Sequence, residues 1–497
     1  MLKRVQHDVT ILLLLTDIQI NNISKMKLKY ILCYSLGFLV FSCQSQEQHQ
    51  CTFKGKITAE HDQCGYVEVP NNWENKEDGN TEIAYIVIKS KSENRKKDPV
   101  VFLQGGPGGN VLSYANVFRN LALDPDRDFI LYDQRGIGFS NAICPNLGAS
   151  FLEVMAADIS LDQEDETLLT VSSDCITALK SPTFKTAFGT TQSAMDLEAL
   201  RQHLGYTQIN LFGGSYGTRL GLKYMELYPK SIRSSILSGL FPLETRLYEN
   251  IYTNLNRSLE ILFDTCENDK DCATDYPNLK ENFESVCKQL DSKGASFTID
   301  GDEFIINKHD FLLLVQQMLY NRQTIAAVPS FIMAFKNENT KPVLIAIQAF
   351  AARLGLINVA TYWSVNVKDE SSFNNINMIA ADEKKFPSLA NGVSLFGSDP
   401  EVLKDWPSES NANTEMNAVV SDIPTLLVSG AWDPITPPSN GEKAAKSLKN
   451  VSHIIFPSEG HVPMNACFLQ MAKTFLNNPM EKVDDACVKT PNLIVFK

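Results

Sequence analysis

One stretch, residues 208–229, limits the possible folds of this chain more than any other. Residues 209–212 (INLF) are a short, mostly apolar run of strand length, and apolar residues recur at helical spacing in residues 220–227. Between them stands GGSYG (213–217), a G-x-S-x-G pattern in strand-turn-helix context. Such a turn lifts one serine above the carboxyl edge of a parallel sheet, and its glycines let strand and helix approach closely. The sequence therefore predicts that Ser215 is a nucleophile.

The composition is that of a globular protein with a large core. Of the 497 residues, 44% are hydrophobic and 21% are charged, which excludes the disordered and fibrous classes and leaves room for a second unit. The formal net charge is -13. Because nucleic acids attract basic surfaces, we expect no nucleic-acid partner.

The N-terminal region predicts export from a bacterial cytoplasm. A basic start at Met26 precedes apolar residues 31–42, and this run is typical of a signal peptide and too short to span a bilayer. We therefore interpret residues 1–25 as an extension upstream of the true start. The run ends VFSC, similar to a lipobox, so Cys43 is predicted to carry lipid and anchor the protein to a membrane through the polar tether 44–50. The alternative is a secretory signal cut near Cys43 without lipidation. Both predict a periplasmic or cell-envelope protein.

Export permits disulfides, and the cysteines are spaced for them. Cys33 and Cys43 belong to the signal region. Nearest-neighbour pairing of the others leaves Cys287 over and predicts Cys51–Cys64, Cys144–Cys175, Cys266–Cys272 and Cys467–Cys487. Cys287 could equally replace Cys272 in its pair, because spacing does not fix connectivity. No C-x-x-C with matching histidines occurs, so no zinc site is predicted.

Strand-like and helical segments alternate through the first half of the chain. Apolar runs predict strands at 65–70, 81–90, 98–103, 129–132, 209–212 and 232–240, and a helix at 193–204 precedes the serine turn. Two more strands are predicted at 424–429 and 451–456. The segment 98–103 (DPVVFL) ends in a continuous apolar run, as expected of a strand buried on both faces. This order predicts an α/β fold with parallel connections.

Between residues 242 and 417 the pattern changes to mainly helical spacing. Helices are predicted at 252–263, 279–290, 310–320, 325–335 and 343–354, with one hairpin at 296–306 that turns at Asp300-Gly301. An insertion over the carboxyl edge of a sheet restricts access to that edge. We therefore divide the chain into a signal region (1–42), a tether (43–50), a first core part (51–241), a helical lid (242–417) and a second core part (418–497).

A glycine-rich loop follows the strand at 98–103. Residues 104–109 (QGGPGG) match no nucleotide-binding pattern, and Pro107 lacks the N–H that a phosphate cradle would use. Such a loop can instead bring backbone N–H groups to a developing oxyanion. We expect Gly106 and Tyr216 to supply the two donors. The alternative is a simple tight turn.

Charged residues follow the strand at 129–132. Charges at the end of a buried strand need partners. We therefore interpret Asp133 and Arg135 as a network that braces the loops, and prefer this to a catalytic role.

Three residues form a candidate catalytic set. A serine hydroxyl becomes a nucleophile when a base accepts its proton and a carboxylate orients that base. Ser215, Asp433 and His461 have the chain order serine, acid, histidine that this serine turn requires. The alternative base is His453, but it lies inside a predicted strand, where a structural histidine is expected. We assign Ser215, Asp433 and His461 as the catalytic residues.

Several motifs together resemble one family. The chain resembles the exported tripeptidyl aminopeptidase branch of the prolyl aminopeptidase family from about Cys51 to Cys487. The motifs that carry the resemblance are GGPGG (105–109), DQRGIGFS (133–140), GGSYGT (213–218), SGAWDPITPP (429–438) and GH (460–461). The chain departs from the family's pattern at Gln104 and Ser238. The resemblance implies an α/β-hydrolase fold, with a mostly parallel central sheet and a large, mainly helical lid inserted after the strand that follows the nucleophile turn.

The resemblance also implies an activity. It implies a serine aminopeptidase of tripeptidyl or prolyl type, which releases short peptides or single residues from free peptide N-termini through an acyl-enzyme on Ser215, without a metal or other cofactor. The group that would bind the substrate's α-ammonium is not fixed by the sequence. Its candidates are Asp399, Glu401, Asp405 and Glu244.

Two other functions are considered. A carboxylesterase of the same fold acting on small acyl esters is one alternative, because a triad does not distinguish amide from ester. A non-catalytic binding protein on a hydrolase fold is the other. The presence of all three triad residues disfavours this second alternative.

Overall fold

The computed structural model describes residues 51–121, 123–299, 302–337, 339–393, 403–404, 406–408, 417–489 and 494–496. The predicted signal region, the lipid-bearing Cys43 and the tether lie outside these residues. Within the described part of the chain, no helix has both the length and the apolar character needed to cross a bilayer.

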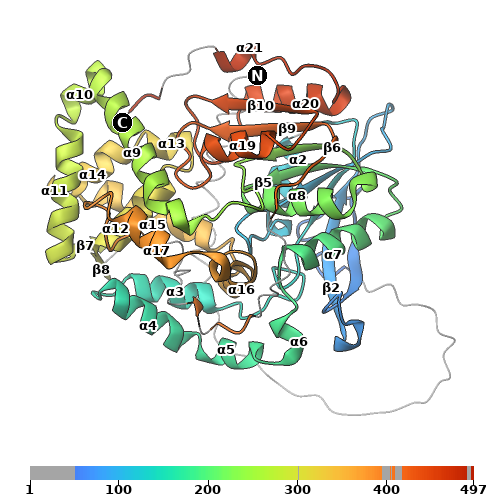
Figure 1. Ribbon diagram of the computed structural model, residues 1–497, viewed down its shortest axis with the longest axis horizontal. Helices are drawn as coiled ribbons and strands as arrows, with labels where there is room; N and C mark the ends of the chain where they lie inside the picture. The colour runs from blue at the N-terminus through green and yellow to red at the C-terminus, as the bar shows by residue number, and fades with distance from the viewer. Residues whose placement is uncertain are drawn as a thin grey trace. The chain divides into compact units, whose positions relative to one another are not determined.

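An eight-stranded sheet, ordered β1-β2-β4-β3-β5-β6-β9-β10, lies at the centre of the described chain (Figure 1). Its strands are β1 Gln63–Pro70, β2 Asn80–Ile88, β3 Val100–Leu103, β4 Phe129–Tyr132, β5 Ile209–Gly214, β6 Ile232–Ser238, β9 Thr425–Gly430 and β10 Val451–Phe456. β2 pairs antiparallel with β1 and β4, whereas the other neighbours are parallel. The prediction of a mostly parallel sheet is confirmed.

Helices cover both faces of this sheet. Leu211 of β5 and Leu220 of helix α8 (Tyr216–Leu227) belong to one buried cluster. Phe212, the next residue of β5, belongs to the other cluster and contacts Phe468 of α20 (Ala466–Asn477), with ring centroids 5.7 Å apart. Such alternation is the period of a β-strand. Because both faces are covered, β3, β5 and β9 are buried throughout, which explains their apolar runs.

Four more helices belong to the sheet region. They are α2 Ala115–Leu121, α7 Thr190–His203, α19 Pro438–Ala445 and α21 Ala486–Lys489. The helix predicted at 193–204 is α7, which begins three residues earlier, directly after Gly189.

A first helical segment joins β4 to α7, and the sequence analysis did not predict it. It contains α3 Leu147–Met155, α4 Leu161–Val171, α5 Ser173–Leu179 and α6 Pro182–Lys185. A local signal was present at α4, where Ser160 and Gln163 form a reciprocal capping box. This segment reaches the second helical region through the contact of α3 with α16 (Val359–Asp369).

The second helical region is inserted between β6 and β9, and in Figure 1 it lies to one side of the sheet. Its elements are α9 Ile251–Asn268, α10 Lys270–Asp275, α11 Leu279–Ser292, β7 Ala295–Ile299, β8 Asp302–Ile306, α12 Lys308–Met318, α13 Arg322–Ile325, α14 Val328–Asn337, α15 Thr340–Leu354, α16 and α17 Ile376–Glu383. The antiparallel pair β7 and β8 is the predicted hairpin, and its turn lies outside the described residues.

Two predictions in this insertion were wrong. The single helix predicted at 325–335 is divided into α13 and α14, with Pro329 in the first turn of α14, where a residue without an N–H is tolerated. Helices α10, α16 and α17 were missed. α16 is buried along its whole length and therefore shows no amphipathic period to detect.

The disulfides follow the nearest-neighbour pattern. Cys51 bonds Cys64, Cys144 bonds Cys175, Cys266 bonds Cys272 and Cys467 bonds Cys487. Cys287 is free and buried, and burial raises the pKa of its thiol to about 12. A thiol with so high a pKa is a poor nucleophile.

Candidate active site

Ser215 occupies the strained turn that the sequence predicts between β5 and α8. Its backbone φ is 56°, a value rare for a residue with a side chain. The two flanking glycines are required sterically. A Cβ at Gly213 would lie 2.6 Å from the carbonyl oxygen of Gly217, and one at Gly217 would lie 1.9 Å from that of Leu103. The turn therefore tolerates no side chain at either position.

Asp433 and His461, from loops after β9 and β10, are in direct contact. Asp433 Oδ2 lies 2.8 Å from Nδ1 of His461 and also accepts a hydrogen bond from the Thr436 hydroxyl. Its Oδ1 accepts from the backbone N–H groups of Ile435 and Thr436, both at 2.8 Å. Burial alone would raise the pKa of Asp433, but the neighbouring imidazole and these hydrogen bonds hold it below its usual value.

The loop that carries His461 lies against the serine turn. A Cβ placed on Gly239, just after β6, would lie 3.4 Å from Cε1 of His461. A Cβ on Gly214, the residue before Ser215, would lie 3.7 Å from the side chain of Val462. The structure thus brings the predicted acid, base and nucleophile segments to the same edge of the sheet.

His453, the alternative base, contacts other groups. Its Nε2 lies 2.9 Å from the hydroxyl oxygen of Ser429 in β9, and its ring fills the space beside Gly441 of α19. The side chain is half-buried between a strand and a helix. This position is that of the structural histidine expected from the sequence.

The glycine-rich loop packs directly on the serine turn. A Cβ on Gly105 would lie 2.7 Å from the carbonyl oxygen of Gly214 and 2.8 Å from Cβ of Ser215. Gly106 has a φ of 118°, which favours glycine. Tyr216 is the first residue of α8, and the first N–H groups of a helix have no partner within it. Gly106 and Tyr216 both line the cavity at Ser215, and their role as oxyanion donors stays a prediction.

A small cavity of about 40 Å³ opens onto Ser215. Gly106 and Tyr216 line it from the sheet side. Tyr320, Tyr362 and Asn366 line it from the helical insertion, which therefore forms one wall of the candidate site.

The insertion also holds the loops of Asp433 and His461. The carbonyl of Tyr320 accepts a hydrogen bond of 2.8 Å from the His461 N–H, and the two rings lie 4.6 Å apart between centroids. The guanidinium of Arg353 stacks on the Tyr320 ring, with its Cζ 4.3 Å from the ring centroid. Arg257 of α9 donates to the backbone carbonyls of Ala431 and Asp433. The sequence analysis missed all three residues, since no local motif marks them.

A buried carboxylate lies behind the cavity wall. Glu370, at the end of α16, accepts backbone hydrogen bonds from Leu247 and Tyr248. Within the described part of the chain, neither its Oε2 nor the buried Nδ2 of Asn366, one turn earlier, has a hydrogen-bond partner. Burial raises the pKa of Glu370, partly offset by the nearby guanidinium of Arg219.

The sequence analysis named four candidates for the group that binds the substrate's ammonium. Asp399, Glu401 and Asp405 lie outside the described residues. Glu244 is partly exposed.

Asp133 and Arg135 brace the loops, but through separate partners. Asp133 accepts from the backbone N–H groups of Val111, Leu112 and Phe139, and burial raises its pKa to about 6. Arg135 instead pairs with Asp196 of α7, at 2.7 Å from its Nε. The prediction of a bracing role is confirmed, whereas a direct Asp133–Arg135 pairing is not present among these contacts.

Two family models match the chain. Residues 98–273 match the model described as the alpha/beta hydrolase fold, and residues 398–487 match the model described as TAP-like protein. The chain has the α/β-hydrolase fold. The first match contains the serine turn and the second contains Asp433 and His461.

Relatives agree with this assignment. The α/β hydrolase is 24% identical to YuaR of Escherichia coli (strain K12) over 90% of this chain and 95% of that protein. It is 30% identical to the serine protease Hip1 of Mycobacterium tuberculosis (strain ATCC 25618 / H37Rv), over 35% of each chain. It is 28% identical to the tripeptidyl aminopeptidase of Streptomyces coelicolor, over 36% of this chain and 35% of that one. These matches confirm the predicted resemblance to the tripeptidyl aminopeptidase branch and the prediction of a serine hydrolase.

Solved structures are also similar to this α/β hydrolase. A probable hydrolytic enzyme from Pseudomonas aeruginosa PAO1 is 12% identical over 84% of this chain and 95% of its own, with a TM-score of 0.40.

Proposed function

We propose that this chain is a serine aminopeptidase that releases short peptides or single residues from peptide N-termini. The observation that carries the proposal is the contact between Asp433 and His461 beside the serine turn, on a cavity that Ser215 lines. The names of the relatives, a serine protease and a tripeptidyl aminopeptidase, support a peptide substrate.

The proposed cycle begins with attack of the Ser215 hydroxyl oxygen on the scissile carbonyl carbon. His461 accepts the hydroxyl proton and then transfers it to the leaving amine, while Asp433 holds the imidazole in the required tautomer and stabilises its cation. The imidazole of His461 and the hydrogen bonds to Asp433 outweigh its burial and favour its ionised form, as this role needs. Water, activated by His461, then hydrolyses the acyl-enzyme.

Backbone N–H groups of Gly106 and Tyr216 would stabilise the tetrahedral oxyanion. Both residues line the cavity next to Ser215. Preorganised donors of this kind typically contribute on the order of 3 kcal/mol each to the transition state.

Glu370 is our candidate for recognition of the substrate's amino end. A buried carboxylate oxygen without a partner is costly unless something satisfies it. A peptide α-ammonium would supply both a proton donor and the opposite charge. Glu370 lies directly behind Leu247 and Asn366, which line the cavity, and the helical region at 242–417 would act as the lid that limits substrate length.

The decisive test compares matched peptides. We expect kcat/KM for a free-amine tripeptide amide to exceed that of its N-acetylated form by at least about tenfold, the value of one charge-assisted hydrogen bond. Equal values would favour the carboxylesterase. A fluorophosphonate probe should label the protein and fail to label a Ser215→Ala variant.

We also propose that the protein is exported and held in the cell envelope by lipid on Cys43. The disulfides among the described residues support an oxidising compartment. Fractionation of a Cys43→Ala variant tests the anchor. The variant should move from the membrane to the soluble fraction.

A further inference from the structure

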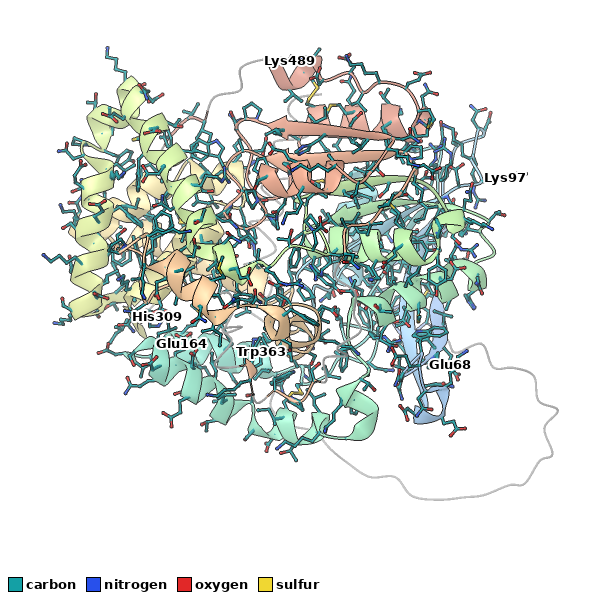
Figure 2. The ribbon with its side chains drawn as sticks, viewed as in Figure 1. Glu68, Lys97, Glu164, His309, Trp363 and Lys489 are labelled. Atoms are coloured by element: carbon teal, nitrogen blue, oxygen red, sulfur yellow. A yellow bond between two sulfur atoms is a disulfide. The ribbon has the colours of Figure 1, made fainter. Side chains whose placement is uncertain are left out.

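A buried cluster of three ionisable side chains lies away from the candidate active site. Glu164 comes from the first turn of α4, and His309 and Asp310 come from the first turn of α12. The residues are only 4%, 6% and 1% exposed, in that order. Figure 2 labels Glu164 and His309, which lie together where the two helical regions meet.

The facing atoms of this cluster are close together, and one of them is left without a partner. His309 Nε2 forms an ion pair with Glu164 Oε2 at 2.9 Å and lies 3.8 Å from Asp310 Oδ2. Among the residues that the structure describes, nothing donates a hydrogen bond to the buried Oδ1 of Asp310. Buried polar atoms without hydrogen bonds are uncommon in native proteins and call for another partner.

The spacing fits a common metal ion. One ligand atom from each residue can be chosen so that all three lie within 4.8 Å of one another. In a tetrahedral zinc site with bonds of about 2.0–2.1 Å, neighbouring ligand atoms lie roughly 3.3 Å apart. The observed separations of 2.9 and 3.8 Å fall on either side of that value.

We propose that Glu164, His309 and Asp310 bind a divalent transition-metal ion of the zinc class. One imidazole and two carboxylates form a three-ligand set of known zinc type, and water would complete the coordination. Calcium and magnesium prefer all-oxygen sites, so the histidine favours zinc, cobalt or manganese.

The surrounding charges agree with a bound cation. Two carboxylates face one imidazole in a buried space, so the cluster has room for additional positive charge.

The ion would tie the two helical regions together. The Asn307 side chain already donates to the backbone carbonyls of Ala157 and Ile159, just before α4. α12 has 11 residues, so its two ends lie about 16 Å apart. Its far end leads to Tyr320, which contacts His461. A metal at the start of α12 would therefore stabilise the wall of the cavity without touching substrate.

Metal content tests the proposal directly. The purified protein is stripped with EDTA, dialysed against ZnCl2 and then against metal-free buffer, and measured by mass spectrometry. We expect about one zinc per wild-type chain, and less than about a tenth of that in Glu164→Gln and His309→Gln. His453→Gln is the control, because it removes a half-buried histidine that lies outside this cluster, and it should keep one zinc. ZnCl2 should raise the Tm of wild type and control but not of the two variants.

Two results would overturn the proposal. One is a wild-type protein that retains no zinc and whose Tm is unchanged by EDTA and ZnCl2, which would make the cluster a proton-bearing ion pair. The other is zinc that binds equally well to His309→Gln. If the variants fail to fold, X-ray absorption spectroscopy of the wild-type zinc complex identifies the ligands instead. A spectrum with one imidazole and oxygen ligands supports the proposed site, whereas sulfur ligands or several imidazoles contradict it.

Discussion

Asp433 and Glu370 are both fully buried carboxylates near the same cavity, but the protein treats them differently. Asp433, on the sheet side, has hydrogen bonds to both oxygens and a depressed pKa. Glu370, on the side of the insertion, has one oxygen without a hydrogen bond and a raised pKa. The sheet side is thus complete without a ligand, whereas the insertion retains polar groups that a ligand could satisfy. The cluster at Glu164 resembles Glu370, because it also contains a buried carboxylate oxygen that has no hydrogen bond among the described residues.

The largest expected effect comes from the serine on the sheet side. Ser215→Ala should lower kcat by on the order of 10⁴ to 10⁶ because the nucleophile is lost. The fold should remain, because alanine keeps the Cβ of Ser215 and loses only the hydroxyl. Steady-state kinetics with circular dichroism as the folding control measures both. Activity that survives in this variant would remove the proposed acyl-enzyme.

Asp433→Asn should have the next largest effect, a loss in kcat of about 10⁴-fold. The amide keeps the shape but donates to His461 Nδ1 instead of accepting from it, which disfavours the required tautomer. KM should change little, because Asp433 lies behind the imidazole. A change mainly in KM would mean that Asp433 positions substrate instead.

A smaller and more selective effect is expected on the side of the insertion. Glu370→Gln keeps the acceptor for the Leu247 N–H but removes the negative charge, so KM for free-amine peptides should rise about 10- to 100-fold. N-acetylated substrates should be unaffected. Glu244→Gln, at a partly exposed position, is the control and should behave as wild type. An equal loss for both substrate types would show that Glu370 is only structural.

The smallest expected effect is the pH dependence of stability at the Glu164 cluster. In the metal-free protein, folding raises the pKa of both His309 and Asp310, so the folded state binds more protons than the unfolded chain. The stability that His309 contributes is therefore present below about pH 6.5 and is lost as the pH rises through its folded pKa. The slope per proton is at most about 1.4 kcal/mol per pH unit.

Denaturant titrations across this pH range should show that loss in the wild type and a shallower slope in Glu164→Gln. Saturating ZnCl2 should cancel the slope in the wild type, because metal replaces the protons. A wild-type stability that rises with pH while the variant's does not would contradict the assigned direction.

Most of the sheet and the candidate active site were predictable from short segments. The glycines around Ser215 are set by backbone contacts within the turn and with the neighbouring strand, and the apolar runs of β3, β5 and β9 reflect burial on both faces. These requirements act on a few consecutive residues, so they leave a local pattern. The chain order of Ser215, Asp433 and His461 was predictable for the same reason, since each follows a recognisable strand.

What the sequence determined by itself is therefore the sheet and the serine turn, whereas it left Cys272 and Cys287 as alternative partners of Cys266. Only the tertiary structure decided that Tyr320, Arg257 and Glu370 support or face the candidate site, and that Glu164 meets His309. The physical reason is the separation along the chain between the residues in contact. Each of these contacts joins segments more than a hundred positions apart, and fully buried helices such as α16 have no polar face to mark their orientation.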